Sequence, residues 1–230
     1  MSKVKVTIDN QNVEVEEDSS ILEAAKEIGV DIPVLCYHPD LSLHGACRVC
    51  VVEDEESGNL LASCATPVRD GMAINTRSMK ARKARRKNVE LLLANHPNDC
   101  LGCDRNGQCE LQDLTYELGI SSEDVEKFAG EQSEYDLDTT GPALKRDPNK
   151  CILCGRCVRI CEEVQGVSAL QFTDRGFNSI VTTAFDLPQA EINCVNCGQC
   201  ATVCPVGAIT ELSEIDKVWA ALEDDDQHVL

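Results

Sequence analysis

The sequence predicts an α+β protein built from three small modules, and three observations lead to this prediction. A chain of 230 residues is too long for one small domain and suits two or three. Two stretches near the N-terminus alternate apolar and polar residues around turn-forming residues, which is typical of β-hairpins. A cysteine pattern then repeats within residues 150–210, which predicts an internally duplicated C-terminal module.

The first module is expected at residues 1–77. Its predicted hairpins join residues 4–8 to 13–15 and residues 49–52 to 60–62. Between them, Ser20 and Glu23 form the pattern of a capping box that starts a helix over residues 21–28, and Gly29 follows where that helix would end. Two hairpins and one helix suit a β-grasp domain of the ferredoxin-like kind.

The remaining segments are assigned from caps, charge and the repeat. Ser78 predicts the start of a helix that ends near residue 95, and a second helix is expected at 110–118 before Gly119. The expected divisions are a small helical domain at 78–120, an acidic linker at 121–149, the duplicated domain at 150–212, and a C-terminal helix with an acidic tail at 213–230.

Charge and cysteine content narrow the functional classes. The formal net charge is −19, and residues 110–138 hold ten carboxylates against the single Lys127. Such a field disfavours binding to nucleic acid or to an anionic membrane. The N-terminus lacks the apolar core of a signal peptide, and no apolar run approaches the length of a membrane span. Fifteen cysteines, an odd number, are therefore expected in the reducing cytoplasm as metal ligands and not as disulfides.

The duplicated module carries the clearest ligand pattern. Two runs of the form C-x2-C-x2-C-x3-C are the signature of two [4Fe-4S] clusters, or cubanes. We expect the fourth cysteine of each run to start a helix that points away and to bind the other cluster. The two expected ligand sets are Cys151, Cys154, Cys157 and Cys204, and Cys194, Cys197, Cys200 and Cys161. Zinc is the alternative, but zinc sites usually pair two C-x-x-C units. In the first run, Glu162 stands where proline usually follows.

Two further ligand sets precede the repeat. The first module holds Cys36, Cys47, Cys50 and Cys64, whose central C-x2-C is that of a plant-type [2Fe-2S] ferredoxin, although the first gap is longer. The helical module holds His96, Cys100, Cys103 and Cys109, which we assign to a His-ligated [4Fe-4S] cluster. Spacing alone leaves a zinc ribbon open for the former and a Cys3His zinc site open for the latter.

The ligand count supports one [2Fe-2S] and three [4Fe-4S] clusters. Four such sites need sixteen ligands, and the fifteen cysteines with His96 supply them and leave no cysteine for a catalytic nucleophile. We therefore assign no catalytic residue. For His38 and His44 the default interpretation is ordinary loop histidines, and the alternative is that they donate hydrogen bonds to sulfur. For Arg156 and Arg159 the default is solvated charges, and the alternative is that they tune the cluster potential. The basic residues 80–87 lack interleaved aromatics and are expected to pair with the acidic segment or with a partner.

These four motifs, in this order, resemble the N-terminal cluster region of multi-subunit [FeFe]-hydrogenases of the electron-bifurcating type. They are also similar to the matching part of NAD-linked formate dehydrogenases and, more distantly, to the large iron–sulfur subunit of complex I. In the hydrogenases and dehydrogenases the chain continues into a catalytic domain, whereas this sequence ends at Leu230. A separate subunit and a fragment of a longer chain are therefore both open.

The resemblance implies an electron-transfer subunit or domain that is non-catalytic by itself. It would relay single electrons among a flavoprotein that oxidises NAD(P)H, a ferredoxin, and a hydrogenase or formate dehydrogenase catalytic subunit, in a hetero-oligomer. The sequence contains no G-x-G, so no dinucleotide fingerprint can be drawn and flavin and nicotinamide are expected on a partner. The alternatives are an iron–sulfur redox sensor and a zinc-structured interaction protein.

Overall fold

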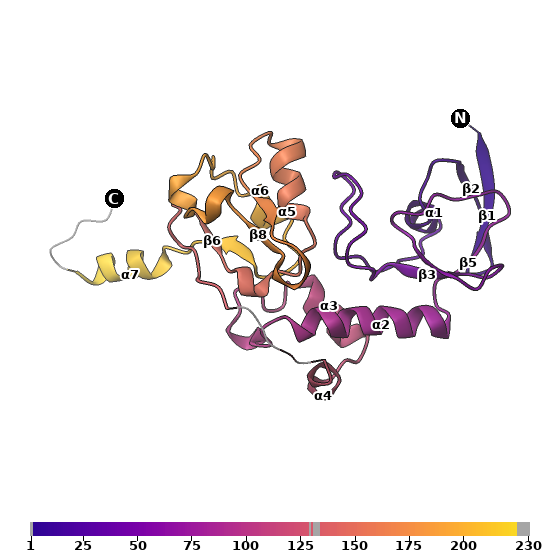
Figure 1. Ribbon diagram of the computed structural model, residues 1–230, viewed down its shortest axis with the longest axis horizontal. Helices are drawn as coiled ribbons and strands as arrows, with labels where there is room; N and C mark the ends of the chain where they lie inside the picture. The colour runs from indigo at the N-terminus through magenta and orange to yellow at the C-terminus, as the bar shows by residue number, and fades with distance from the viewer. Residues whose placement is uncertain (1, 129, 131–133, 225–230) are drawn as a thin grey trace.

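The structure is a computed structural model, and it describes residues 2–128, 130 and 134–224. It has the expected mixture of helices and strands (Figure 1). A five-stranded sheet lies at one end of the molecule and the duplicated region at the other, while the long helix α2 (Met79–Ala94) runs along one side between them. The expected acidic tail beyond residue 224 lies outside the described residues.

The N-terminal sheet contains both predicted hairpins and one strand that the sequence did not predict. Its strand order is β2-β1-β5-β3-β4. The new strand, β5, pairs parallel with β1 and antiparallel with β3, so it joins the two hairpins into one sheet. The strands are β1 (Lys3–Ile8), β2 (Gln11–Glu16), β3 (Val51–Asp54), β4 (Leu60–Ala62) and β5 (Ala73–Asn75).

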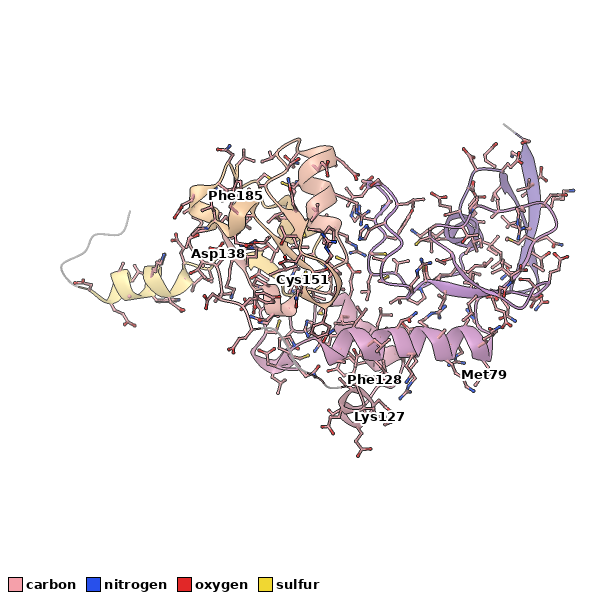
Figure 2. The ribbon with its side chains drawn as sticks, viewed as in Figure 1. Met79, Lys127, Phe128, Asp138, Cys151 and Phe185 are labelled. Carbon is pink, nitrogen blue, oxygen red and sulfur yellow. The ribbon has the colours of Figure 1, made fainter. Side chains whose placement is uncertain are left out.

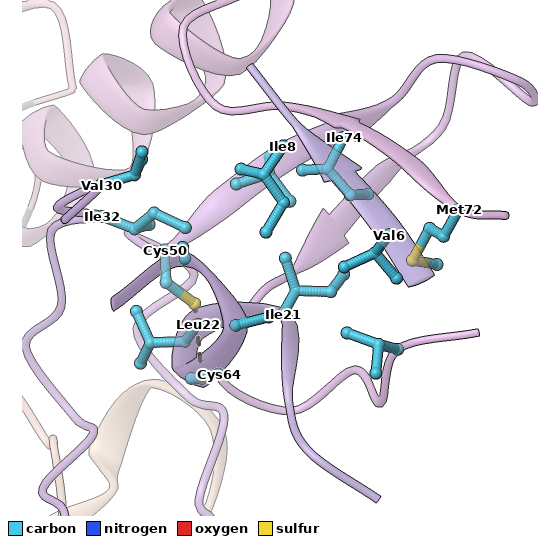
Figure 3. Packing of buried hydrophobic residues seen from close by; sticks show 14 of the residues in the cluster. Val6, Ile8, Ile21, Leu22, Val30, Ile32, Cys50, Cys64, Met72 and Ile74 are labelled. Carbon is cyan, nitrogen blue, oxygen red and sulfur yellow. Dashed lines mark hydrogen bonds between the residues drawn. The ribbon is translucent and has the colours of Figure 1, made fainter. Parts of the chain in front are cut away.

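Helix α1 (Ile21–Glu27) packs against this sheet, and its capping box is confirmed. The Ser20 hydroxyl accepts a hydrogen bond from the Glu23 amide, and the Glu23 carboxylate accepts one from the Ser20 amide. Gly29 has a φ of +71°, a left-handed conformation that glycine adopts without steric cost. The resulting core (Figure 3) is mainly aliphatic, with Tyr37 as an aromatic member, and Cys50 and Cys64 belong to it.

The helical region contains α2, α3 (Glu110–Glu117), α4 (Ser122–Glu126) and the short 3-10 turn η1 (Cys100–Gly102). Ser78 caps α2 as predicted, by accepting a hydrogen bond from the Ala81 amide. The expected pairing of the basic helix with the acidic segment is also present, because the Arg86 Nη2 atom forms an ion pair with the Asp124 Oδ2 atom at 2.6 Å. Lys87 lies over the ring of Phe128, beside α4 (Figure 2).

The C-terminal region is assembled from short elements. Two-stranded sheets pair β6 (Leu144–Arg146) with β9 (Ile209–Glu211) and β7 (Gln171–Thr173) with β8 (Ile180–Thr182). The remaining elements are η2 (Pro148–Lys150), α5 (Arg156–Arg159), the π-helical turn η3 (Ile160–Val164), η4 (Gly176–Asn178), η5 (Ala184–Asp186), η6 (Gln189–Glu191), α6 (Gln199–Thr202) and α7 (Ile215–Glu223). Leu144–Arg146 was placed in the linker, but it forms a strand because a distant partner, β9, satisfies its backbone.

A second hydrophobic core connects all three regions. It includes Leu35 and Val49 beside the sheet, Val89 and Leu111 from α2 and α3 of the helical region, and Val206 from the duplicated region. Because these side chains bury one another, the three modules fold against each other and not as separate beads. In the part of the chain that the structure describes, no helix is long and apolar enough to cross a membrane.

Arg85 joins α2 to the first module and generates a stability prediction. Its buried guanidinium donates to the carbonyls of Val49, Val51 and Thr76, at 3.2, 3.1 and 3.3 Å. Substitution Arg85→Met leaves those carbonyls without this donor and should destabilise the protein by about 2 kcal/mol or more. Thermal unfolding followed anaerobically by circular dichroism should show the lower melting temperature.

The matched control for this substitution is Arg82→Met on the exposed side of the same helix. It should change stability by no more than about 0.5 kcal/mol. Equal melting temperatures for the two variants would show that Arg85 does not hold α2 to the sheet.

Candidate metal centres

The first candidate centre lies at the open end of the β3–β4 hairpin, where Cys50 precedes β3 and Cys64 follows β4, and the loop before β3 carries Cys36 and Cys47. Cys36, Cys50 and Cys64 are buried, and the Cys50 and Cys64 sulfurs are 3.3 Å apart. Cys47 and Cys64 are also the two neighbours that most perturb the Cys36 thiol. The structure therefore brings the expected ligand set together.

Electrostatics in this group favour thiolates, the form of cysteine that binds metal. The hydrogen bond with Cys64 lowers the pKa of the Cys50 thiol to about 6. Hydrogen bonds with Cys47 and Cys64 also lower the pKa of Cys36 well below its usual range. The same contacts raise the pKa of Cys47 and of Cys64, which donate to those thiolates. The four thiols therefore share protons among themselves, and binding of a metal would displace those protons.

The second centre gathers around His96, just after α2 ends. His96, Cys100, Cys103 and Cys109 line one cavity. The His96 Nδ1 atom lies 2.8 Å from the Pro97 carbonyl oxygen. Since a carbonyl can only accept, Nδ1 carries the proton and Nε2 carries the free lone pair. That Nε2 is buried and has no hydrogen-bond partner among the described residues.

The unpartnered Nε2 is the observation that tests whether the residues fit a bound metal. Burial lowers the pKa of His96, so the ring stays neutral and its lone pair stays available. A buried nitrogen without a partner is costly unless something binds it. The geometry therefore fits a metal-bound imidazole, with the Pro97 carbonyl fixing the tautomer.

Gly207 shapes the wall of the same centre from the duplicated region. A β-carbon at this position would lie 2.7 Å from the Cys103 sulfur, closer than real contacts allow. Gly207 follows Cys204 by three residues, so the end of the second run closes the His96 centre. The sequence motif for this centre did not include Gly207, because the contact joins residues far apart in the chain.

The duplicated region forms two cavities, and the cysteines divide between them as the crossed arrangement expects. One is lined by Cys151, Cys154, Cys157 and Cys204. The other is lined by Cys161, Cys194, Cys197 and Cys200. Each run thus contributes three cysteines to one cavity and its fourth to the other.

The backbone repeats along with the sequence. Leu153 and Gly155 have φ values of +55° and +68°, and the equivalent Asn196 and Gly198 have +53° and +77°. These left-handed residues curl each loop around its cavity and then start α5 and α6. The expectation that the fourth cysteine starts a helix is wrong: the helix begins just before the third cysteine, at the left-handed glycine.

Burial governs the thiols of this region. It raises the pKa of Cys151 to about 11 and that of Cys154 and of Cys200 to about 12. These thiols are protonated at neutral pH until a metal displaces the proton. The Leu153 amide lies 3.4 Å from the Cys151 sulfur, which would stabilise a metal-bound thiolate.

Two arginines of the first run are placed differently from expectation. Arg156 and Arg159 are only 5% and 6% exposed, and both make hydrogen bonds to residues beside the ligands. Sequence reasoning treated them as solvated because a single charged residue in a short loop usually faces water. The repeat offered one signal, since the second run has uncharged Gln199 and Thr202 at the equivalent positions.

The loop histidines of the first module make no sulfur contact that the described residues show. His38 accepts a hydrogen bond from the Asp40 amide, and His44 stacks on Phe172 with ring centroids 5.6 Å apart. Among the described residues, no three His, Cys, Asp or Glu side chains converge closely enough to hold a single metal ion. Measurement of the iron and zinc content of the protein therefore decides whether these sites hold iron–sulfur clusters or zinc.

Sequence models of three protein families match consecutive parts of the chain. Residues 1–79 match a 2Fe-2S iron-sulfur cluster binding domain. Residues 85–124 match the NADH-ubiquinone oxidoreductase-G iron-sulfur binding region, and residues 141–210 match the ferredoxin-like domain of NADH-quinone oxidoreductase subunit 3.

Curated relatives match nearly the whole chain. The NADP-reducing hydrogenase subunit HndD of Solidesulfovibrio fructosivorans is 44% identical over 235 residues, which cover 100% of this chain and 40% of the relative. The NADH-ubiquinone oxidoreductase 75 kDa subunit of Reclinomonas americana is 41% identical over 90% of this chain and 29% of its own length. This chain therefore spans less than half of these relatives, and the complex I subunit is nearly as similar as the hydrogenase subunit.

A solved structure extends the similarity to the fold. One chain in the crystal structure of NAD+-reducing [NiFe]-hydrogenase in the H2-reduced state is 33% identical, with a TM-score of 0.83. The match covers 92% of this chain and 88% of that one. Sequence and fold thus agree over almost all of this chain.

The two cavities of the duplicated region give a test of crossed ligation by iron counting. Cys204→Ala and Cys151→Ala should each remove the same cluster, so the double variant should lose only about four irons. The pair Cys204→Ala and Cys194→Ala should lose about eight, because those residues line different cavities. Iron analysis after anaerobic reconstitution measures both. The reverse pattern would mean that each run binds its own cluster.

The contact between Gly207 and Cys103 gives a second test. Gly207→Ala should displace Cys103 and cause selective loss of the His96 centre, because the new methyl group overlaps its sulfur. Gly102→Ala is the matched control, since a β-carbon there meets nothing within 4 Å. Electron paramagnetic resonance (EPR) of the reduced protein should show one set of signals missing in the first variant and all signals in the second. Full retention by Gly207→Ala would contradict the described packing.

Proposed function

Because the chain belongs to the family of iron–sulfur chains shared by NAD(P)-linked hydrogenases and the 75 kDa subunit of complex I, we propose that it is an electron-transfer unit of such an oxidoreductase. It carries one [2Fe-2S] and three [4Fe-4S] clusters and relays single electrons. It takes them from a flavoprotein that oxidises NAD(P)H and delivers them to a catalytic hydrogenase or formate dehydrogenase subunit, with ferredoxin as a further partner. It is not catalytic by itself.

The observation that carries this proposal is the division of the sixteen candidate ligands into four spatial groups. One group lies at the N-terminal sheet, and each of the other three lines its own cavity. The unpartnered Nε2 of His96 supports a metal ligand at the position where the sequence lacks a sixteenth cysteine.

The finer fold assignments support the same function. The five-stranded mixed sheet with α1 against it suits a β-grasp domain at residues 1–77. The twin cysteine runs with their repeated backbone suit a 2[4Fe-4S] ferredoxin-like domain, here extended from 150–212 to include the β6–β9 pair. The helical domain at 78–120 then provides the His96 centre between them.

A bound iron–sulfur cluster supplies reversible uptake of one electron at a potential set by its charge, hydrogen bonds and exposure. The chain's own residues control those quantities. Burial of Cys154 and Cys157 excludes water, and backbone amides such as that of Leu153 donate to sulfur. At the His96 centre, the neutral imidazole replaces a thiolate and so removes one negative charge, which favours the reduced state.

The partners follow from what this chain lacks and from its charge. No G-x-G occurs in the sequence, so flavin and nicotinamide are assigned to a partner in a hetero-oligomer. The net charge of −19 disfavours nucleic acid. We place the protein in the cytoplasm, where thiols stay reduced.

Metal and sulfide content is the direct test of this proposal. Protein purified anaerobically should contain about fourteen irons and as many acid-labile sulfides, from one [2Fe-2S] and three [4Fe-4S] clusters. Dithionite should reduce it, and an artificial acceptor should reoxidise it. Stoichiometric zinc at the His96 group in a fully reconstituted sample would contradict the four-cluster assignment and favour a zinc-structured module.

The same preparation tests whether the chain only conducts electrons. With all cysteines assigned to clusters, it should not turn over hydrogen, formate or NADH until partner subunits are added. Sustained turnover by the isolated chain, after contaminating enzymes are excluded by active-site inhibition and a tagless control purification, would contradict the proposal.

A further inference from the structure

Helix α5 places two buried arginines at the point where three candidate centres meet. Arg156 and Arg159 lie on either side of Cys157, within the first cysteine run. Buried guanidinium groups are costly unless they are well paired, because they remain charged. Their partners therefore indicate what each arginine does.

Arg159 connects the first run to the [2Fe-2S] site. Its Nη2 atom donates to the Cys36 carbonyl at 2.6 Å and lies 3.4 Å from the Cys154 carbonyl. Its Nε donates to Gly155 at 3.2 Å, and its Nη1 donates to the Ser42 carbonyl. One guanidinium thus holds the backbone of a ligand from each of two centres.

The long gap between Cys36 and Cys47 explains how Arg159 reaches that far. Leu41 packs in a small core with Ile160 and Val203 of the duplicated region. The Ser42 amide donates to Glu163 at 2.9 Å. Together with the His44–Phe172 stack, these contacts dock the loop on the first run. The extra residues, which distinguish this spacing from the plant type, therefore form an interface with α5 and η3.

Arg156 points to the His96 centre in the same way. Its two terminal nitrogens lie 2.6 and 2.9 Å from the two oxygens of Glu110, a bidentate pair. Glu110 directly follows the ligand Cys109, and its amide donates to the Pro205 carbonyl beside the ligand Cys204. Arg156 Nη1 is also 3.5 Å from the Val203 carbonyl. This arginine therefore joins residues adjacent to ligands of the His96 centre and of the first cavity.

The internal repeat provides a natural comparison. The equivalent residues of α6 are Gln199 and Thr202, which carry no charge. Thr202 is exposed, whereas Arg159 is buried. A cysteine run of this kind therefore folds without arginines, and their presence in the first run alone matches the docking of two further centres on it.

We infer that Arg156 and Arg159 are positioning residues that couple the centre of Cys151, Cys154, Cys157 and Cys204 to its two neighbours. Arg159 couples it to the [2Fe-2S] site, and Arg156 couples it to the His96 site. This inference rests on the proposed function, because it needs clusters at those sites. Each guanidinium fixes the relative position of two ligand loops. The positive charge of Arg159, which donates to carbonyls, favours an added electron on either side, and that of Arg156 offsets the carboxylate of Glu110 beside the ligand Cys109.

EPR-monitored redox titration of the full chain tests the two roles separately. Arg159→Met should weaken the magnetic interaction of the [2Fe-2S] centre and lower its midpoint potential, leaving the His96 centre unchanged. Arg156→Met should do the converse. Loss of one charge-assisted hydrogen bond corresponds to about a tenfold change in the reduction equilibrium, which is about 59 mV for one electron.

Control variants separate charge from packing and from general damage. Methionine fills much of the space of the arginine stem but carries no charge. If the charge of Arg159 sets the midpoint potential, Arg159→Lys should restore most of the potential that Arg159→Met loses. Lysine cannot reach both carbonyls, so the magnetic interaction should stay weakened in Arg159→Lys. This measurement still tests the inference if Arg159→Met fails to retain iron. Arg175→Met, at an exposed position of the same region, should change neither quantity.

Three outcomes would overturn the inference. The first is that Arg156→Met and Arg159→Met shift the same neighbouring centre, in addition to the centre of Cys151, Cys154, Cys157 and Cys204 that they share. The second is a change in midpoint potential and magnetic interaction, in Arg156→Met or Arg159→Met, that is no larger than the change in Arg175→Met. The third is an unchanged magnetic interaction in Arg159→Lys. Missing clusters in the wild-type protein would instead contradict the proposed function, so the two failures are distinguishable by iron content.

Discussion

The structure depends on buried guanidinium groups that hold loop backbones in place. Metal ligands need fixed positions, yet most of the candidate ligands here lie on loops or very short elements, which have little core of their own. Arg85, Arg156 and Arg159 each donate to backbone carbonyls or to a carboxylate across a boundary between regions. A guanidinium suits this task because its several donors lie in one plane and remain charged.

The second hydrophobic core also holds the ligand loops in place. Aromatic residues make up only 3% of the chain, and among the described residues Tyr37 is the one aromatic side chain in a buried core. Small aliphatic side chains fill the second core instead, and Leu35, Val89 and Val206 bring three regions into it. Several candidate ligands, including Cys36, Cys109 and Cys154, belong to that core. The same contacts therefore bury these ligands and pack the three regions together, so a substitution in this core will affect both.

Local patterns were enough to predict much of this fold. The capping box at Ser20, the cap at Ser78 and the two N-terminal hairpins depend on residues close in sequence, and the structure confirms them. Strand β5 and the β6–β9 pair were missed because three-residue strands have too little pattern and their partners are remote. The candidate ligands were named from spacing alone. The buried arginines and Gly207 were not, because their partners lie on other elements.

Exposed and buried charges have different effects on the electrostatic potential at the candidate centres. Most of the excess of carboxylates that gives the net charge of −19 lies in exposed segments, where water and salt screen it. Arg156 and Arg159 lie inside, where screening is weak. A centre that gains an electron becomes more negative, so a nearby buried positive charge stabilises it far more than distant surface carboxylates oppose it. An acidic protein can therefore keep favourable surroundings for electrons at its centre, provided that the charges buried beside the ligands are positive.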